Sequence, residues 1–425
     1  MNPARARHPR HVERLVLVAG SASLLDSAAI ISVGSALPLW RSQLRLDDVE
    51  VGVVSATMTI AIALGALAGG WLADRLGRRR VFTTTVALYA VGAALVALAG
   101  SRTGLVAGVA VLGLGSGADL PASIALVAGR VPARLRGRMV AATHVMWTVG
   151  IVLASAAAFA VSPFGLPGMR AVFGALALGA LATLAARRRA VPPDLDLDPD
   201  LGPDPGAAAG PRTGAGEVAA APVARGDVRV LVAVALFYLL YTLVANTFGS
   251  FRTYLLVTVG DASQAGATAI SFGVTLVGLV GTVAFSAIAD SRWRRTVYPF
   301  AAVALVCSQA MLALTVGQSL SATVAALVLY ALAYPYVGEG LYKVWAQESV
   351  SPAARATFQG ATIAGARAAA ALFALVTPSL LADDPAVLFW LLTVIAAAAV
   401  LVGRRSRERP SAGPAARSTR GVPTP

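Results

Sequence analysis

Six ionisable side chains lie inside long apolar stretches of this sequence, where a charge is costly and usually serves a function. They are Asp26, Asp119, His144, Glu339, Lys343 and Arg367. A carboxylate or an imidazole in a poorly hydrated cavity can load and release a proton. An arginine stays charged and must face an acid, backbone carbonyls or an anion. Together these groups predict a membrane site at which protons and ions bind.

Three acids are candidates for proton coupling. Asp26 lies near the middle of the first apolar stretch, and it either carries a proton or pairs permanently with a cation. Asp119 precedes Pro121, whose ring removes a backbone donor, so this acid either caps a broken helix or takes part in coupling. Glu339 lies four residues before Lys343, and the two side chains either neutralise each other along one helix face or exchange partners.

A second group of residues suits the binding of a small polar solute. Amides and phenols hydrogen-bond hydroxyl groups, and aromatic rings pack against ring faces. Tyrosine is also a common anchor at the membrane interface. Arg367 either pairs with one of the acids or binds a substrate carboxylate, and His144 is either a proton shuttle or a neutral hydrogen-bonded side chain. The predicted substrate-binding residues are Asn246, Tyr241, His144, Trp147, Tyr336, Lys343 and Arg367.

Composition predicts that the elements holding these residues are membrane helices. The chain has 425 residues, of which 57% are hydrophobic and 13% are charged. A soluble protein could not bury so much apolar surface, whereas helices in lipid need not. A span needs about 20 mostly apolar residues. Twelve such stretches occur, near 15–40, 51–72, 81–100, 104–128, 139–161, 170–186, 229–256, 265–289, 296–316, 321–346, 358–382 and 386–403.

The distribution of arginine predicts the orientation. The net charge is +14, but the basic residues gather in alternate connections instead of forming a basic domain, which argues against nucleic-acid binding. The cytoplasmic segments would hold most of them, including Arg187 to Arg189, and the outer segments only Arg41, Arg45, Arg102, Arg170 and Arg252. We therefore expect a multi-pass protein of the cell (inner) membrane with both termini cytoplasmic.

The chain divides into two similar halves. A hydrophilic stretch rich in Pro, Gly and Asp cannot bury a core, so we expect a disordered cytoplasmic linker at 190–228. It separates a six-helix half at 1–189 from a second at 229–403, followed by a disordered cytoplasmic tail at 404–425. Asp119 and Glu339 lie 220 positions apart, as do Pro132 and Pro352. Repeated halves around a midplane site are typical of secondary transporters.

The link Gly-Trp-Leu-Ala-Asp-Arg-Leu-Gly-Arg-Arg-Arg at 70–80 resembles the loop 2–3 signature of the major facilitator superfamily, with a weaker second copy at 289–295. The resemblance covers essentially the whole chain. It implies the twelve-helix fold of that family and a role for these residues in gating the inner opening. The implied gating residues are Gly70, Asp74, Arg75, Gly77, Arg78, Arg136, Asp290, Arg294, Glu348 and Arg355.

Two further segments narrow the branch. Gly-Leu-Gly-Ser-Gly-Ala-Asp-Leu-Pro at 113–121 and Tyr-Lys-Val-Trp-Ala-Gln-Glu at 342–348 are similar to segments of the sugar and metabolite–proton symporters. Arg130 stands where that branch usually has Glu. Val109 stands where many sugar porters have a cation, which leaves a proton as the natural counter-ion of Asp26.

These observations predict proton-coupled symport of a sugar, polyol or organic acid by alternating access. Proton-driven export of a drug or metabolite is the alternative, and a receptor or an intramembrane enzyme is less consistent with two copies of the gating loop. The energy source would be the proton gradient. We expect no cofactor, because the sequence has no Walker loop, and no metal site, because it has one cysteine and no histidine cluster. Nothing requires a partner subunit, so we expect a monomer.

Overall fold

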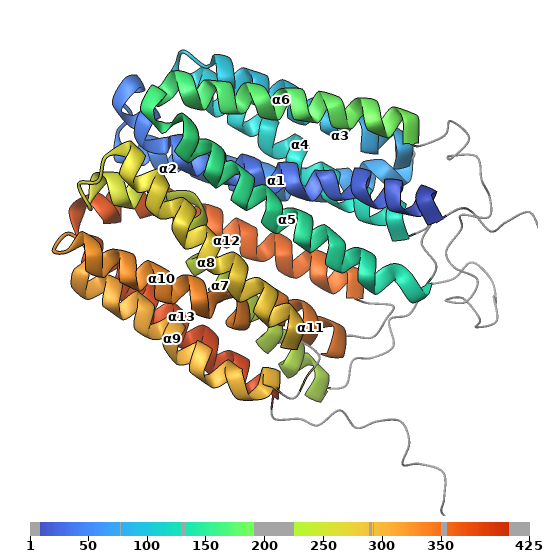
Figure 1. Cartoon of the computed structure of the whole chain (residues 1–425). Helices are drawn as coiled ribbons and strands as arrows, with labels where there is room; N and C mark the ends of the chain where they lie inside the picture. The colour runs from blue at the N-terminus through green and yellow to red at the C-terminus, as the bar shows by residue number, and fades with distance from the viewer. Residues whose placement is uncertain are drawn as a thin grey trace, which may run out of the picture.

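The computed structural model describes residues 9–76, 78–128, 133–190, 225–288, 291, 293–349 and 355–407. These residues are almost entirely helical, because helices satisfy every backbone N–H and C=O within one segment, as a lipid environment requires. Figure 1 shows the helices packed as one bundle of long, roughly parallel rods.

Two sets of helices make up the bundle. The first half contains α1 (Pro9–Leu44), α2 (Asp48–Leu76), α3 (Arg78–Leu98), α4 (Arg102–Ala128), α5 (Ala133–Val161), the one-turn 3-10 helix η1 (Ser162–Phe164) and α6 (Gly165–Ala190). The second half contains α7 (Arg225–Thr258), α8 (Gln264–Ile288), α9 (Trp293–Thr315), α10 (Leu320–Val337), α11 (Glu339–Ser349), α12 (Arg355–Asp383) and α13 (Pro385–Arg407).

The number of membrane crossings is the predicted twelve. Ten stretches of the described residues are long and apolar enough to span a membrane, and one of them, Met146–Arg189, holds both α5 and α6. The twelfth crossing is α4, whose 27 residues exceed the roughly 20 that a span needs. The predicted all-α membrane fold in two six-span halves is therefore confirmed. Most of the predicted linker and tail, at 191–224 and 408–425, lies outside the described residues.

The predicted tenth span is two helices with a break between them. Pro335 lies inside α10, which ends at Val337, and α11 begins at Glu339. A Cβ atom on the intervening Gly338 would lie 2.7 Å from the carbonyl oxygen of Tyr334 and closer still to the hydroxyl of Tyr241, so only glycine fits there. The break places Glu339 in the first turn of α11, where the helix dipole favours an acid.

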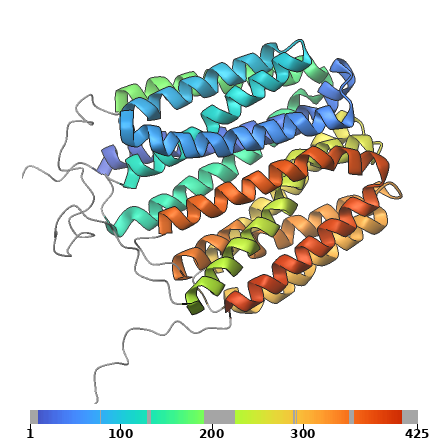
Figure 2. The same ribbon diagram turned by 180° about the vertical axis from the view of Figure 1, so that it is seen from behind.

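The two halves lie side by side and pack against each other, and in both views the first half, blue to green, lies mostly above the second, yellow to red (Figures 1 and 2). We call the end that carries the connections 45–47, 99–101 and 259–263 the outer end. The opposite end, where α1 begins and α13 ends, is the inner end. These names follow the predicted orientation.

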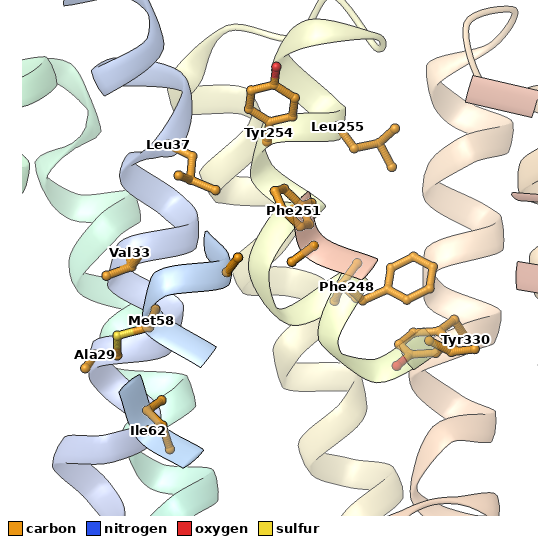
Figure 3. Close-up of a cluster of buried hydrophobic side chains, with 14 of the residues drawn as sticks. Ala29, Val33, Leu37, Met58, Ile62, Phe248, Phe251, Tyr254, Leu255 and Tyr330 are labelled. Atoms are coloured by element: carbon orange, nitrogen blue, oxygen red, sulfur yellow. The ribbon is translucent and has the colours of Figure 1, made fainter. Parts of the chain in front are cut away.

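Contacts between the halves join α1 and α2 to α7 and α8 at the outer end. The hydroxyl of Tyr254 on α7 donates to Asp48 Oδ1 over 2.8 Å. Arg41 forms an ion pair with the same oxygen at 2.8 Å, and its guanidinium lies over the Tyr254 ring. Gln264 Nε2 donates to the backbone oxygen of Ser35 over 2.9 Å. Figure 3 shows the apolar layer beneath, where Leu37 of α1 lies near Phe251 of α7. The outer end is therefore closed.

Close approach of α2 and α12 extends this closure. A Cβ atom on Gly52 would collide with the carbonyl oxygen of Leu375 on the facing helix. Replacing Gly52 with Val should therefore disfavour the closed outer end by about 1–3 kcal/mol, the usual cost of overpacking, and shift the population toward an open outer end.

Spin labels on Ser42→Cys and Ser263→Cys, in a Cys307→Ser background, would report the outer distance between the halves. The distance should lengthen in G52V. Gly273→Val is the matched control, because nothing lies within 4 Å of its Cβ position. An unchanged distance distribution in G52V would contradict this account of the outer contact.

Candidate functional site

A cavity lies between the two halves, below the outer contacts. It has a larger compartment of about 410 Å³ and a smaller one of about 160 Å³. Trp147 of α5, Tyr334 of α10 and Glu339 of α11 line both compartments, so the two form one site. Helices α1 and α5 supply the wall from the first half, and α7, α8, α10, α11 and α12 supply the rest.

The larger compartment is mostly apolar and aromatic. The rings of Phe248 and Tyr330 are stacked with their centres 4.2 Å apart, and Phe285 and Tyr334 complete the aromatic wall. Figure 3 shows Phe248 of α7 next to Tyr330 of α10. Stacked rings of this kind give a flat surface on which a planar or cyclic solute can pack.

Arg252 also lines the larger compartment. Its Nη2 donates to Thr275 Oγ1 over 2.8 Å, and its Nε is buried without a hydrogen bond in the described part of the chain. The sequence assigned Arg252 to an outer connection, and that assignment is wrong. Position 252 is within α7, six residues before its end, and the side chain enters the cavity instead of reaching the surface.

The smaller compartment holds most of the polar residues predicted to bind substrate. Asn246, Tyr241 and Arg367 line it together with Trp147 and Glu339. Arg367 makes no hydrogen bond or ion pair with any other described residue, so its charge faces the cavity. The structure thus brings together five residues from four helices, α5, α7, α11 and α12.

Asp26 lies behind the smaller compartment and is only 3% exposed. Its carboxylate accepts a hydrogen bond from the Ser116 hydroxyl of α4, and the charges of Arg367, Asp119 and Glu339 act on it. The adjacent Ser27 lines the compartment and donates to the backbone oxygen of Trp147 over 2.7 Å, which ties α1 to α5. Asp26 is therefore one residue away from the solute cavity but is shielded from it.

Asp119 does not line the cavity. Its Oδ2 accepts from Arg187 Nη2 over 2.7 Å, and its Oδ1 accepts from Thr85 over 2.8 Å. Arg187 lies over the Phe82 ring, 3.7 Å from its centre, and is buried. The sequence assigned Arg187 to a cytoplasmic connection, but the structure buries it in an ion pair. The carboxylate therefore joins α4 to α6 and α3 instead of capping a broken helix.

The other predicted residues fall into two groups. Tyr336 packs edge-to-face on Phe285, a wall residue, with ring centres 5.8 Å apart. Arg75 is exposed and Arg294 half-buried. The remaining predictions lie outside the described residues, either as side chains or entirely: His144, Lys343, Gly70, Asp74, Gly77, Arg78, Arg136, Asp290, Glu348 and Arg355. Among the side chains that are described, no three His, Cys, Asp or Glu residues gather as metal ligands would.

Comparison with known proteins identifies the family and the fold of the chain. The profile of one family, described as the Major Facilitator Superfamily, matches residues 19–375. The Minor myo-inositol transporter IolF of Bacillus subtilis is 29% identical over 375 residues, which cover 86% of this chain and 84% of that protein. The Niacin transporter NiaP of Acinetobacter baylyi is 37% identical over 118 residues, or 28% of this chain and 27% of that protein.

Among solved structures, the inward-open conformation of the xylose transporter XylE from E. coli superposes with a TM-score of 0.76. The match covers 95% of this chain and 98% of that one, at 16% identity. At this identity the likeness describes the fold alone.

The buried ion pair generates a stability prediction. Replacing Asp119 with Ala leaves the Arg187 guanidinium buried without a partner, which should lower the free energy of unfolding by about 3–5 kcal/mol. Denaturant unfolding of the purified protein in detergent would measure the loss.

Glu50→Gln provides the control, because the Arg102–Glu50 pair is 54% and 32% exposed. Exposed pairs contribute about 1 kcal/mol or less. Equal losses in the two variants would contradict the buried role of Asp119, and partial recovery in the D119A/R187Q double variant would support it.

Proposed function

This chain belongs to the Major Facilitator Superfamily, and we propose that it is a proton-coupled symporter of a small polar metabolite. Membership of this family confirms the resemblance that the segment at 70–80 indicates. The protein is therefore an integral multi-pass membrane transporter of small molecules rather than an enzyme. Proton coupling, the direction of transport and the substrate class are the parts that we propose.

The observation that carries the proposal is the placement of Asp26. A buried carboxylate lies one residue from the solute cavity, under the influence of the Arg367 charge that faces the cavity. Protonation of Asp26 and solute binding can therefore affect each other through Arg367. When Asp26 is protonated, Arg367 loses a nearby negative charge and is left to attract a polar or anionic solute.

The closed outer end supports an alternating-access cycle. With the outer contacts formed, the central cavity would exchange solute with the inner side. Separation of Tyr254 from Asp48, with rocking of the two halves, would open it to the outer side. Glu339, in the first turn of α11, lines both compartments. A solute in either compartment would therefore change the electrostatic environment of this carboxylate. We therefore keep Asp26 and Glu339 as the proton-coupling acids.

Asp119 takes a different role in this proposal. It is bound in a buried ion pair with Arg187 and does not line the cavity, and breaking such a pair is costly. We propose that it braces the first half while Asp26 titrates. Asn246, Tyr241 and Trp147 would contact the solute.

The proposal extends to the cellular setting. The inner cell membrane, cytoplasmic termini and a monomeric unit are consistent with the arginine distribution and with a site formed within one chain. The energy source would be the proton gradient, without a cofactor.

Replacing Asp26 with Asn tests the coupling directly. Asparagine keeps the shape and can still accept the hydrogen bond from Ser116, but it cannot carry a proton. The variant should lose proton-driven accumulation almost completely while retaining solute exchange. Uptake and counterflow of radiolabelled myo-inositol and nicotinate in proteoliposomes would measure both activities.

Asp261→Asn is the matched control, since Asp261 is an exposed acid in the connection before α8. It should transport as the wild type does. Accumulation by D26N at the wild-type level would remove Asp26 from the mechanism, whereas loss of exchange together with accumulation would indicate a role in binding instead of coupling.

A further inference from the structure

We infer that the substrate is a carboxylate carried on a planar ring, and that Arg252 binds the carboxylate in the larger compartment. This inference rests on the proposed transport function and names the substrate class of the same site.

The first step is the charge balance around Arg252. Its guanidinium stays ionised in the membrane interior, where an uncompensated charge is costly. Within the described part of the chain no carboxylate acts on it, and the one titratable group that does is the phenol of Tyr330. Arg367, in contrast, is influenced by Asp26. Among the described residues, Arg252 is therefore a cavity cation on which no acid acts, although Glu339 lines the same compartment.

The second step is the geometry of the guanidinium. Thr275 Oγ1 accepts from Nη2 over 2.8 Å and itself donates to the backbone oxygen of Ser271 over 2.8 Å, so its position is fixed. The Arg252 side chain is thus held at the cavity wall, with Nε enclosed by protein and Nη1 making no hydrogen bond to any described residue. A carboxylate can accept from Arg through two parallel hydrogen bonds, which a hydroxyl group cannot do.

The third step is the shape of the surrounding wall. The stacked Phe248 and Tyr330 rings lie in the same compartment, as do the apolar side chains of Val274 and Leu279. This surface suits the face of a flat apolar ring more than the hydroxyl-rich edges of a sugar. The compartment thus offers an anion site and a ring site together.

The position of Arg252 also places ligand binding next to a contact between the two halves. Ser155 of α5 lies 3.4 Å from Thr275 Oγ1, so the residue that holds Arg252 contacts the other half of the protein. An anion at Arg252 would sit next to this contact between the halves.

Ligand binding to the purified full-length protein in detergent tests the inference without depending on proton flux. Benzoate is the probe, benzyl alcohol tests the need for the carboxylate, and acetate tests the need for the ring. Calorimetric titration should show that benzoate binds more tightly than either analogue. In Arg252→Gln the affinity for benzoate should fall by roughly 10- to 150-fold, as expected for the loss of a charge-assisted hydrogen bond.

Two further variants make the result specific. Arg170→Gln removes an exposed arginine whose Nη2 donates to the Ala99 oxygen, and benzoate affinity should not change. Ligand-free R252Q should unfold at the wild-type temperature or above it, because no acid loses its partner. A marked drop in that temperature would make Arg252 a structural residue and overturn the inference.

The inference is also overturned if benzyl alcohol binds as tightly as benzoate, or if Arg367→Gln abolishes benzoate binding while R252Q keeps it. Benzoate binding that depends on Arg252 but triggers no proton movement would leave the ligand class standing and contradict the proposed symport. Proton influx on addition of myo-inositol, without benzoate binding, would support the proposed symport and contradict the inferred ligand class.

Discussion

Charge compensation inside the membrane is the constraint on which the rest of this structure depends. Hydrocarbon offers no water to ionised groups, so each buried charge needs a partner, a proton or a bound ion. The described charges meet this need in different ways. Asp119 and Arg187 form an ion pair that, with Thr85, joins three helices of the first half. Asp26 has the Ser116 hydroxyl and the nearby Arg367 as partners, and we propose that it also binds a proton. No acid acts on Arg252 within the described part of the chain, and we propose that it binds a solute.

This arrangement separates structural from functional charge. The Asp119–Arg187 ion pair lies away from the cavity and holds helices of the first half together. The charged groups to which we assign a role in transport, Asp26, Arg252 and Arg367, lie at or next to the cavity between the halves. The break at Gly338 places Glu339 there as well. In the proposed cycle, a solute that enters this space alters the electrostatic environment of acids on both halves, and the outer contact through Asp48 and Tyr254 controls which side has access. The proposal thus links binding, proton loading and movement through a small number of side chains.

The fold could be predicted from the sequence because each membrane-spanning helix must contain a long apolar stretch, which is visible in the hydropathy of the chain. The twelve crossings and their division into two halves follow from local patterns. Individual side-chain positions were harder to predict. Arg187 and Arg252 were assigned to connections because arginine near a helix end usually marks a loop. The signal for Arg252 was present, since residue 252 lies within the predicted span 229–256. Arg187 lies one residue beyond its predicted span, and only its contacts with Phe82 of α3 and Asp119 of α4 show that the side chain turns inward.

The most direct test of the central claim is solute-triggered proton movement. Proteoliposomes containing a pH-sensitive dye would be exposed in turn to myo-inositol, L-arabinose, nicotinate and benzoate, without an imposed proton gradient. Symport predicts inward proton movement on addition of at least one solute, absent in protein-free liposomes and in D26N. Proton release from the lumen on addition of a lipophilic cation, with no response to any of these solutes, would contradict symport and indicate proton-driven export.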